Sequence, residues 1–295
     1  MARTKQTRRP SVAGQPTSWT RFHLPLGQDW PIWPGNPADV QLGPLAGVEG
    51  CLKAWLGRIV ETPEQAAFII LWETSDALED FKESPACSEF LLGLPENDNR
   101  QASVVSGSSL RDLSLDNNSL PPPPSRFLTF RQVEGYPTPD LAGRVTFTAL
   151  MIPHNDVTIR LKWYWAVRHA FGAFTPHGCE VITWRVPFPH MRHLVAWFWV
   201  IGEDVWVDEK FGKLEQNEGE NNGRTILCEF RHWNGIYDAT PELEEVSAKD
   251  PLARESWVQA VAGAMPPVTA WEQERWDIRV VPCFEIPEED EDEDS

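Results

Sequence analysis

The chain has 295 residues, of which 41% are hydrophobic, so it can form one large or two small globular domains with a sizeable core. Its net charge of −18 argues against nucleic acid and anionic membrane surfaces as partners. No apolar run approaches the ~20 residues of a membrane-spanning helix. The start lacks the apolar core of a signal peptide, and the five cysteines include no Cys-x-x-Cys, which together predict free thiols and a cytoplasmic location.

Residues 1–18 are polar, basic and contain proline, which predicts a disordered N-terminus. Residues 2–7, ARTKQT, match the start of a core-histone tail. Both interpretations stay open here, namely coincidence and mimicry recognised by a chromatin reader. Residues 21–26 can form a first strand, and residues 29–45, rich in proline, glycine and tryptophan, predict a packed loop or an irregular helix.

The next segment predicts two strands joined by a turn. Trp55 and Gly57 lie on the first of these strands, and Glu61 and Pro63 mark the turn, where the glutamate is expected to be structural. Residues 66–72 are a short continuous apolar run that ends in a tryptophan, which is typical of a strand buried on both faces.

A helix is expected to follow over residues 77–94, because polar capping residues precede it and apolar residues recur at helical spacing. Pro85 lies inside this pattern and predicts a kink or a break. Residues 95–125 are of low complexity and end in four prolines, which predicts a disordered insertion or a linker. Residues 126–133 alternate as a strand does.

These motifs together resemble a known family. They are a Trp-x-Gly, a Glu-x-Pro, a tryptophan that ends a strand, and a Ser-Pro followed by phenylalanine, at Trp55, Gly57, Glu61, Pro63, Trp72, Ser84, Pro85 and Phe90. They resemble the fungal branch of the antibiotic-biosynthesis-monooxygenase-like family, whose fold is a dimeric α+β barrel. The resemblance covers residues 46–94 and implies a fold more firmly than a function, because ferredoxin-like barrels carry unrelated chemistries.

The second half of the chain repeats this plan loosely. Strands are predicted over residues 145–152, 180–186, 194–201, 224–233 and 271–281, helices over residues 156–174 and from Thr240 onward, and an acidic loop over residues 208–223. A strand ending in tryptophan, a helix interrupted by proline and an alternating strand occur in the same order in both halves. A recurring order of this kind indicates an internal repeat.

The predicted fold class is therefore α+β, with two tandem ferredoxin-like units that form a dimeric-type α/β barrel. The expected divisions are a disordered start at 1–18, a first unit at 19–138 with its insertion at 95–125, a second unit at 139–284 and an acidic disordered tail at 285–295. Such a tandem chain can close the barrel within itself as a monomer, and pairing into a homodimer is the alternative.

Three histidines are candidate general bases, because imidazole titrates near neutral pH. His169 shares a helix face with Trp165, His154 follows a strand, and His232 lies on a strand face with Cys228 and Phe230. For each one the alternative is a solvated or hydrogen-bonded histidine without a catalytic role. No histidine, cysteine and carboxylate cluster has metal-ligand spacing, so no metal site is expected.

Fifteen tryptophans against three tyrosines are the compositional outlier, and large aromatic side chains line apolar ligand cavities as well as cores. We expect a hydrophobic small-molecule ligand to bind in a tryptophan-lined pocket formed by Trp55, Trp72, Trp165, Trp199 and Trp233.

The family resemblance implies an enzyme that acts on an aromatic or polycyclic molecule. Related barrels oxidise such substrates without a metal or flavin, so no cofactor is expected. The leading hypothesis is a tailoring enzyme of fungal secondary metabolism, either a cofactor-free monooxygenase or an acid–base cyclase or isomerase. The alternative is a non-catalytic small-molecule binder or stress-associated interaction protein of the same fold.

Overall fold

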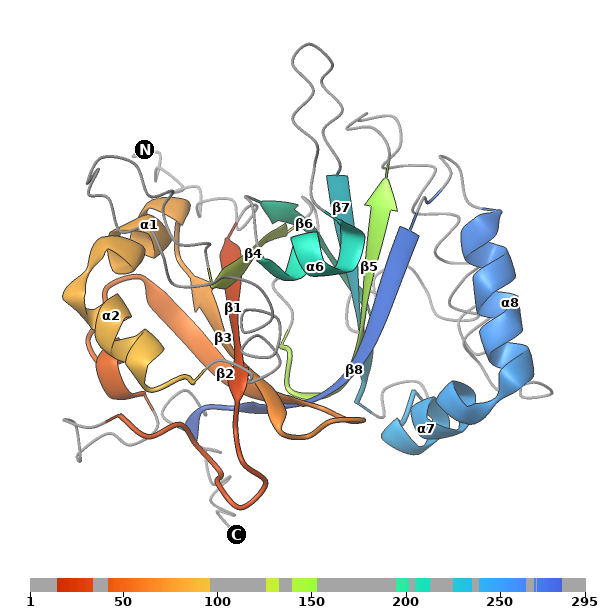
Figure 1. Ribbon diagram of the computed structural model, residues 1–295, viewed down its shortest axis with the longest axis horizontal. Helices are drawn as coiled ribbons and strands as arrows, with labels where there is room; N and C mark the ends of the chain where they lie inside the picture. The colour runs from red at the N-terminus through yellow and green to blue at the C-terminus, as the bar shows by residue number, and fades with distance from the viewer. Residues whose placement is uncertain are drawn as a thin grey trace, which may run out of the picture.

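The computed structural model describes most of the predicted strands and the helices around them. The described residues are 15–33, 42–95, 126–132, 140–152, 195–201, 205–212, 225–234, 239–263, 268 and 270–282. Eight antiparallel strands close into one barrel in the order β1-β3-β2-β8-β5-β7-β6-β4, and helices lie outside it on either side (Figure 1).

The first half contributes four neighbouring strands and the helices that follow its third strand. The strands are β1 (Pro16–His23), β2 (Cys51–Ile59), β3 (Gln65–Trp72) and β4 (Phe127–Gln132). The helices are a short 3-10 turn at Gly43–Leu45, α1 (Ser75–Glu83) and α2 (Pro85–Leu92). The spatial order β4-β1-β3-β2 is the ferredoxin-like order.

The second half repeats that order with its own four strands, β8-β5-β7-β6. They are β5 (Gly143–Ile152), β6 (Val195–Ile201), β7 (Thr225–Trp233) and β8 (Ala270–Val280). The helices described in this half are α6 (Val205–Phe211), α7 (Pro241–Lys249) and α8 (Pro251–Ala262). The predicted helix at 156–174 and strand at 180–186 lie outside the described residues.

Two seams join the halves into the closed barrel. The second strand of each half pairs with the fourth strand of the other, so that β2 pairs with β8 and β6 pairs with β4. The prediction of an α+β chain with a barrel built from two ferredoxin-like sets of strands is confirmed.

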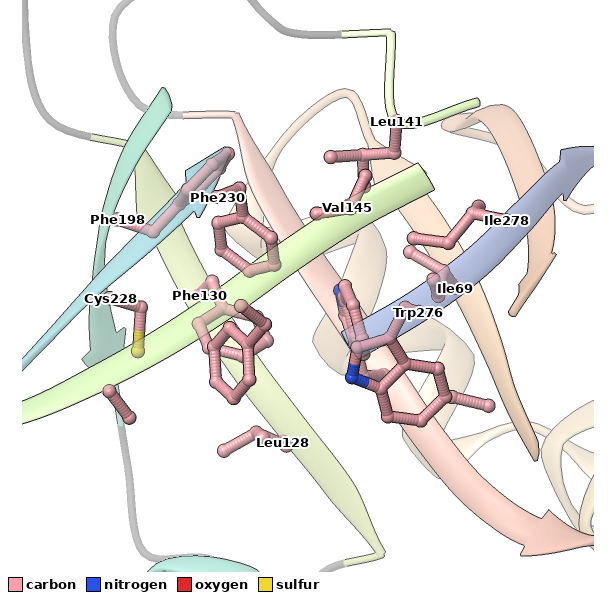
Figure 2. Packing of buried hydrophobic residues seen from close by; sticks show 14 of the residues in the cluster. Ile69, Leu128, Phe130, Leu141, Val145, Phe198, Cys228, Phe230, Trp276 and Ile278 are labelled. Carbon is pink, nitrogen blue, oxygen red and sulfur yellow. The ribbon is translucent and has the colours of Figure 1, made fainter. Parts of the chain in front are cut away.

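Alternating residues of each strand fill the barrel with one aromatic core. Trp19 lies at its centre, with its ring centroid 5.3–5.8 Å from those of Phe130, Phe147, Phe230 and Trp276. Figure 2 shows Phe130 and Phe230 next to each other, with Trp276 farther along the interior, on the side of β8. All five side chains are at most 1% exposed, so the interior of the barrel is packed with side chains.

The helix-facing side of the first half is a second apolar core. Trp33 lies over it, stacked 6.0 Å from Phe90, and its indole N–H donates to the carbonyl oxygen of Phe90 at 3.1 Å. The backbone approaches this ring closely at two glycines. A Cβ atom on Gly93 would lie 2.3 Å from Trp33, and one on Gly43 would lie 2.4 Å from it.

The proline breaks in the helices are confirmed in both halves. Ser84 ends α1 and caps α2, because its hydroxyl accepts a hydrogen bond from the backbone N–H of Cys87. Asp250 caps α8 in the corresponding way, through the N–H of Leu252. In each case the proline occupies the first position of the second helix, where its missing N–H costs nothing.

Two elements differ from the sequence-based expectation. β1 begins at Pro16, because Thr17 and Ser18 already pair with β3 and β4 inside the barrel wall. α6 includes residues 208–211, for which the acidic composition predicts a loop. Its Trp206 is buried against the barrel core, with its ring centroid 5.5 Å from that of Phe147, so a local apolar anchor outweighs the polar composition of the segment.

Candidate functional site

A tryptophan ends the third strand of each half and makes the same contact. The indole N–H of Trp72 donates to the hydroxyl of Ser18 at 2.8 Å, and that of Trp233 donates to Thr146 at 2.9 Å. Ser18 lies opposite the residue two before Trp72, and Thr146 lies opposite the residue two before Trp233. These shared contacts fix which positions of the two halves are equivalent.

The equivalent positions differ in polarity on the side that faces the helices. Counted back from the tryptophan, Phe68 and Ile70 of β3 correspond to Glu229 and Arg231 of β7. All four side chains are at most 1% exposed. The fold therefore accepts apolar side chains at these two places, and the second half has a buried ion pair there instead.

The helices show the same change. Counted from the capping threonines Thr74 and Thr240, Leu78 and Phe81 of α1 correspond to Glu244 and Ser247 of α7. Glu244 is fully buried and Ser247 is 3% exposed. The ring centroid of Phe81 lies 5.0 Å from that of Trp72 in the first half, whereas the counterpart of Phe81 in the second half is a serine.

The ion pair on β7 is buried between the sheet and α8. The guanidinium Nε of Arg231 donates to Glu229, and its guanidinium carbon lies 5.4 Å from the ring centroid of Trp257. Burial raises the pKa of Glu229, and the attraction of Arg231 offsets part of that rise. Glu229 Oε2 has no hydrogen-bond partner among the described residues.

Glu244 ties α7 to the sheet through two arginines. It accepts from Arg144 at 2.7 Å and from Arg275 at 2.5 Å and 2.7 Å. Arg275 also donates to Glu245 at 2.9 Å and to Glu61 at 3.0 Å. Arg275 is thus held by three carboxylates, and the hydrogen bonds that it donates to Glu244 raise its pKa above the ordinary value.

A cavity of about 400 Å³ lies beside this network, between α7, α8 and β8. It is lined by Glu61, Ser247, Ala248, Arg254, Trp257, Trp271, Glu272, Gln273 and Arg275. Trp257 and Trp271 form its aromatic walls, with ring centroids 6.1 Å apart and planes at 80°. Its size and its mixture of aromatic walls with a few polar groups fit a small organic ligand.

Two polar groups of this cavity have unused hydrogen-bonding capacity. Ser247 Oγ is buried and has no partner within the part of the chain that the structure describes. The amide nitrogen of Gln273 donates to Thr148 at 3.1 Å, which orients the side chain and leaves its carbonyl oxygen as an acceptor.

Of the candidate bases, His232 lies away from this cavity, on the opposite face of β7 from Arg231. It shares the barrel-facing side with Cys228 and Phe230, as predicted from strand alternation, and is 3% exposed. It is therefore buried inside the barrel, and the alternative of a solvated histidine does not hold for it. Burial lowers its pKa to about 4, although Asp140 acts in the opposite direction, so the imidazole is neutral at pH 7.

The four predicted pocket tryptophans that the structure describes lie at different places. Trp55 lies inside the barrel and donates to Asp140 at 3.1 Å, Trp72 lies in the apolar core of the first half, and Trp199 is partly buried on β6. Trp233 is on the helix-facing side of the second half, next to the Glu229–Arg231 pair. His154, Trp165 and His169 lie outside the described residues, so their roles stay predictions.

The sequence interpretation missed the residues that form the cavity, chiefly Ser247, Arg254, Trp257 and Trp271. The sequence does contain a signal for the change in polarity. When the strands that end in Trp72 and Trp233 are aligned on these tryptophans, the residues two and four positions earlier are apolar in the first half and charged in the second. No cluster of three metal-ligating side chains occurs within the described ranges, and none of the helices described there is long and apolar enough to span a membrane.

Comparison with known proteins adds distant structural likenesses only. No protein-family model matches the chain, and no curated protein matches it in sequence. A protein from Lactobacillus acidophilus NCFM assigned as a monooxygenase is 9% identical over 90% of this chain and 96% of its own, with a TM-score of 0.34. An anthrone oxidase-like protein is 10% identical over 90% and 93%, with a TM-score of 0.34.

A protein assigned as a chlorite dismutase is 9% identical over 92% of this chain and 97% of its own, with a TM-score of 0.36. TM-scores of this size do not carry an activity from one protein to another. The fold of this chain follows from its own strand order, and its site from its own side chains.

Proposed function

We propose that the protein is a small-molecule enzyme whose substrate binds in the cavity between α7, α8 and β8. The observation that supports this most is the difference between the halves. At equivalent positions the first half packs Phe68, Ile70 and Phe81, while the second half has Glu229, Arg231 and Ser247. Buried polar groups cost stability that apolar residues at these places would not cost, so a role in binding or chemistry accounts for them.

The substrate we propose is aromatic or polycyclic, and the reaction is acid–base chemistry on it. Deprotonation of a phenolic or carbon-bound proton gives an electron-rich anion, which either reacts directly with oxygen, as a cofactor-free monooxygenase requires, or rearranges, as in a cyclase or isomerase. Trp257 and Trp271 supply flat apolar walls for such a molecule. A role in fungal secondary metabolism remains part of this proposal.

The base in this proposal comes from the connection between β5 and β6, where the sequence places His154 and His169. In the first half the equivalent connection, between β1 and β2, sends Trp33 into the space between sheet and helices. His232 is the weaker candidate, because it faces the barrel interior, where Phe230 and Trp276 fill the space.

The test is a titration of the protein with anthrones, hydroquinones and polycyclic terpenoids. Binding is monitored by intrinsic tryptophan fluorescence, and oxygen uptake is recorded in parallel. Saturable binding and turnover that are reduced in Trp271→Ala and lost in His169→Ala support the proposal. Trp30→Ala is the matched control, because Trp30 is also partly buried but does not line the cavity. Its ring lies instead against Arg279, whose guanidinium carbon is 4.0 Å from the ring centroid. Absence of binding to any of these compounds refutes the proposal.

The same titration distinguishes the non-catalytic alternative. A specific observation favours that alternative, since no histidine among the described residues lines the cavity. Saturable binding that depends on Trp271, without oxygen uptake or product, identifies the protein as a small-molecule binder of this fold.

A further inference from the structure

Some charged side chains that line the cavity have ion-pair partners among the described residues, and one does not. Glu61 is bound to Arg275 at 3.0 Å, and Glu272 lies 3.5 Å from Lys210. Arg275 is itself held by three carboxylates. Arg254, on the exposed side of α8, makes no ion pair with any residue that the structure describes. Among the described residues that line the cavity, Arg254 is therefore the cation without an ion-pair partner.

Uncharged polar groups lie in the same wall. Ser247 Oγ is buried without a partner among the described residues, and a hydroxyl so placed loses its hydrogen bonds to water without replacing them. The carbonyl oxygen of Gln273 is an acceptor with a fixed orientation, since the amide nitrogen is bound to Thr148. Both groups are complementary to a ligand that carries a hydroxyl group or a second oxygen beside its ring.

Building on the proposed function, we infer that the ligand of this cavity is an aromatic monoanion. Its ring system packs against Trp257 and Trp271, its anionic oxygen pairs with Arg254, and a neighbouring polar substituent hydrogen-bonds to Ser247 or Gln273. Carboxylates and phenolates share this chemistry. The preference is local, because the chain as a whole carries a net charge of −18 and repels anions at long range.

The size of the preference follows from the exposure of Arg254. A charge-assisted hydrogen bond from an exposed arginine at the rim of a cavity is expected to change the dissociation constant by about 5-fold to 10-fold. We therefore expect naphthoate to bind that much more tightly than the uncharged naphthamide, in titration calorimetry with the full chain. Dinitronaphtholate, an anion at neutral pH, tests the phenolate class beside the carboxylate.

Arg254→Gln should remove the preference for naphthoate over naphthamide and leave the affinity for naphthamide unchanged. The matched control is Arg131→Gln, because Arg131 is likewise exposed but lies on β4, away from the cavity. Equal affinities for the two compounds, or a preference that persists in Arg254→Gln, overturn this inference. The proposed function survives that result if Trp271→Ala still weakens both compounds. If neither compound binds, the inference is overturned, and the titration with anthrones, hydroquinones and polycyclic terpenoids decides the proposed function separately.

Ser247→Ala separates a ligand-binding hydroxyl from a structural one. If the hydroxyl serves the ligand, the thermal midpoint of the free protein stays the same or rises, while hydroxynaphthoate loses affinity by about 3-fold to 10-fold. A lower midpoint with unchanged affinity means that the hydroxyl stabilises the fold, and it removes Ser247 from the binding site.

Discussion

The buried Glu229–Arg231 pair makes a strong prediction, because the first half shows what the fold accepts in its place. Arg231→Leu leaves a carboxylate buried without its counter-charge, and such a change costs about 3–5 kcal/mol at neutral pH. Glu229→Met combined with Arg231→Leu removes both charges and roughly keeps the side-chain volume. We expect this double variant to be as stable as the natural protein or more stable by about 1–4 kcal/mol.

The pH dependence adds a second quantity to that prediction. Burial raises the pKa of Glu229 in the folded protein, so the folded state keeps a proton that the unfolded chain releases. The stability contribution of this group is therefore complete below the unfolded pKa and is lost as the pH rises through the folded one. Arg231→Leu raises the folded pKa further, so its cost should grow as the pH rises above the unfolded pKa of a glutamate, by at most ~1.4 kcal/mol per pH unit.

The assay is urea unfolding of the full chain, followed by tryptophan fluorescence and far-ultraviolet circular dichroism, with the free energy extrapolated to water. Arg131→Leu, at an exposed position of β4, is the control for loss of an arginine. A double variant that is less stable than the single variant would refute the reasoning. That result would mean that the Glu229–Arg231 pair stabilises the fold and that apolar residues cannot replace it at these positions.

Three further predictions concern individual side chains. His232→Leu should make the stability less dependent on pH on the acid side. The folded pKa of His232, about 4, lies below its unfolded value, so the natural protein loses up to about 3 kcal/mol of stability as the pH falls from 6.5 to 4. Unfolding midpoints that fall equally in both proteins over that range would contradict this prediction. Gly93→Ala should lower the unfolding free energy by about 1–3 kcal/mol, since its Cβ would displace Trp33, whereas Gly27→Ala, with open space around it, should change it little. Glu244→Gln should lower the unfolding free energy by about 3 kcal/mol, because Arg144 and Arg275 lose the buried carboxylate that they share. Urea unfolding measures this change, and an unchanged midpoint would mean that the network does not stabilise the fold.

The sequence predicted the strands and the broken helices well, because their local patterns are strong. The apolar run that ends in Trp72, the capping Ser84 with Pro85 and the capping Thr240 with Pro241 each specify local structure on their own. The expected start of the first strand was wrong for the opposite reason. Residues 16–18 are polar and became part of β1 through pairing with two distant strands, which no local pattern encodes.

The site was harder to predict than the fold. Tryptophans in a strand pattern fit a core and a cavity equally well, so Trp55 and Trp72 were expected in a pocket and are found in packed cores. His232 was placed on the correct strand face, but a strand pattern does not tell which face is the inside of a closed barrel. The cavity residues Arg254 and Trp271 come together only when α8 folds back over β8, and that contact has no sequence signal.

The closed barrel has a consequence for how the two halves relate to each other. In a barrel closed by two identical chains, every substitution occurs twice, and both helix-facing sides must serve packing and chemistry at once. Here a single chain supplies all eight strands, so one side can be filled permanently by Trp33 and its neighbours while the other keeps a cavity. The expected stoichiometry is therefore one ligand for each barrel, and one substitution is enough to alter every site in solution.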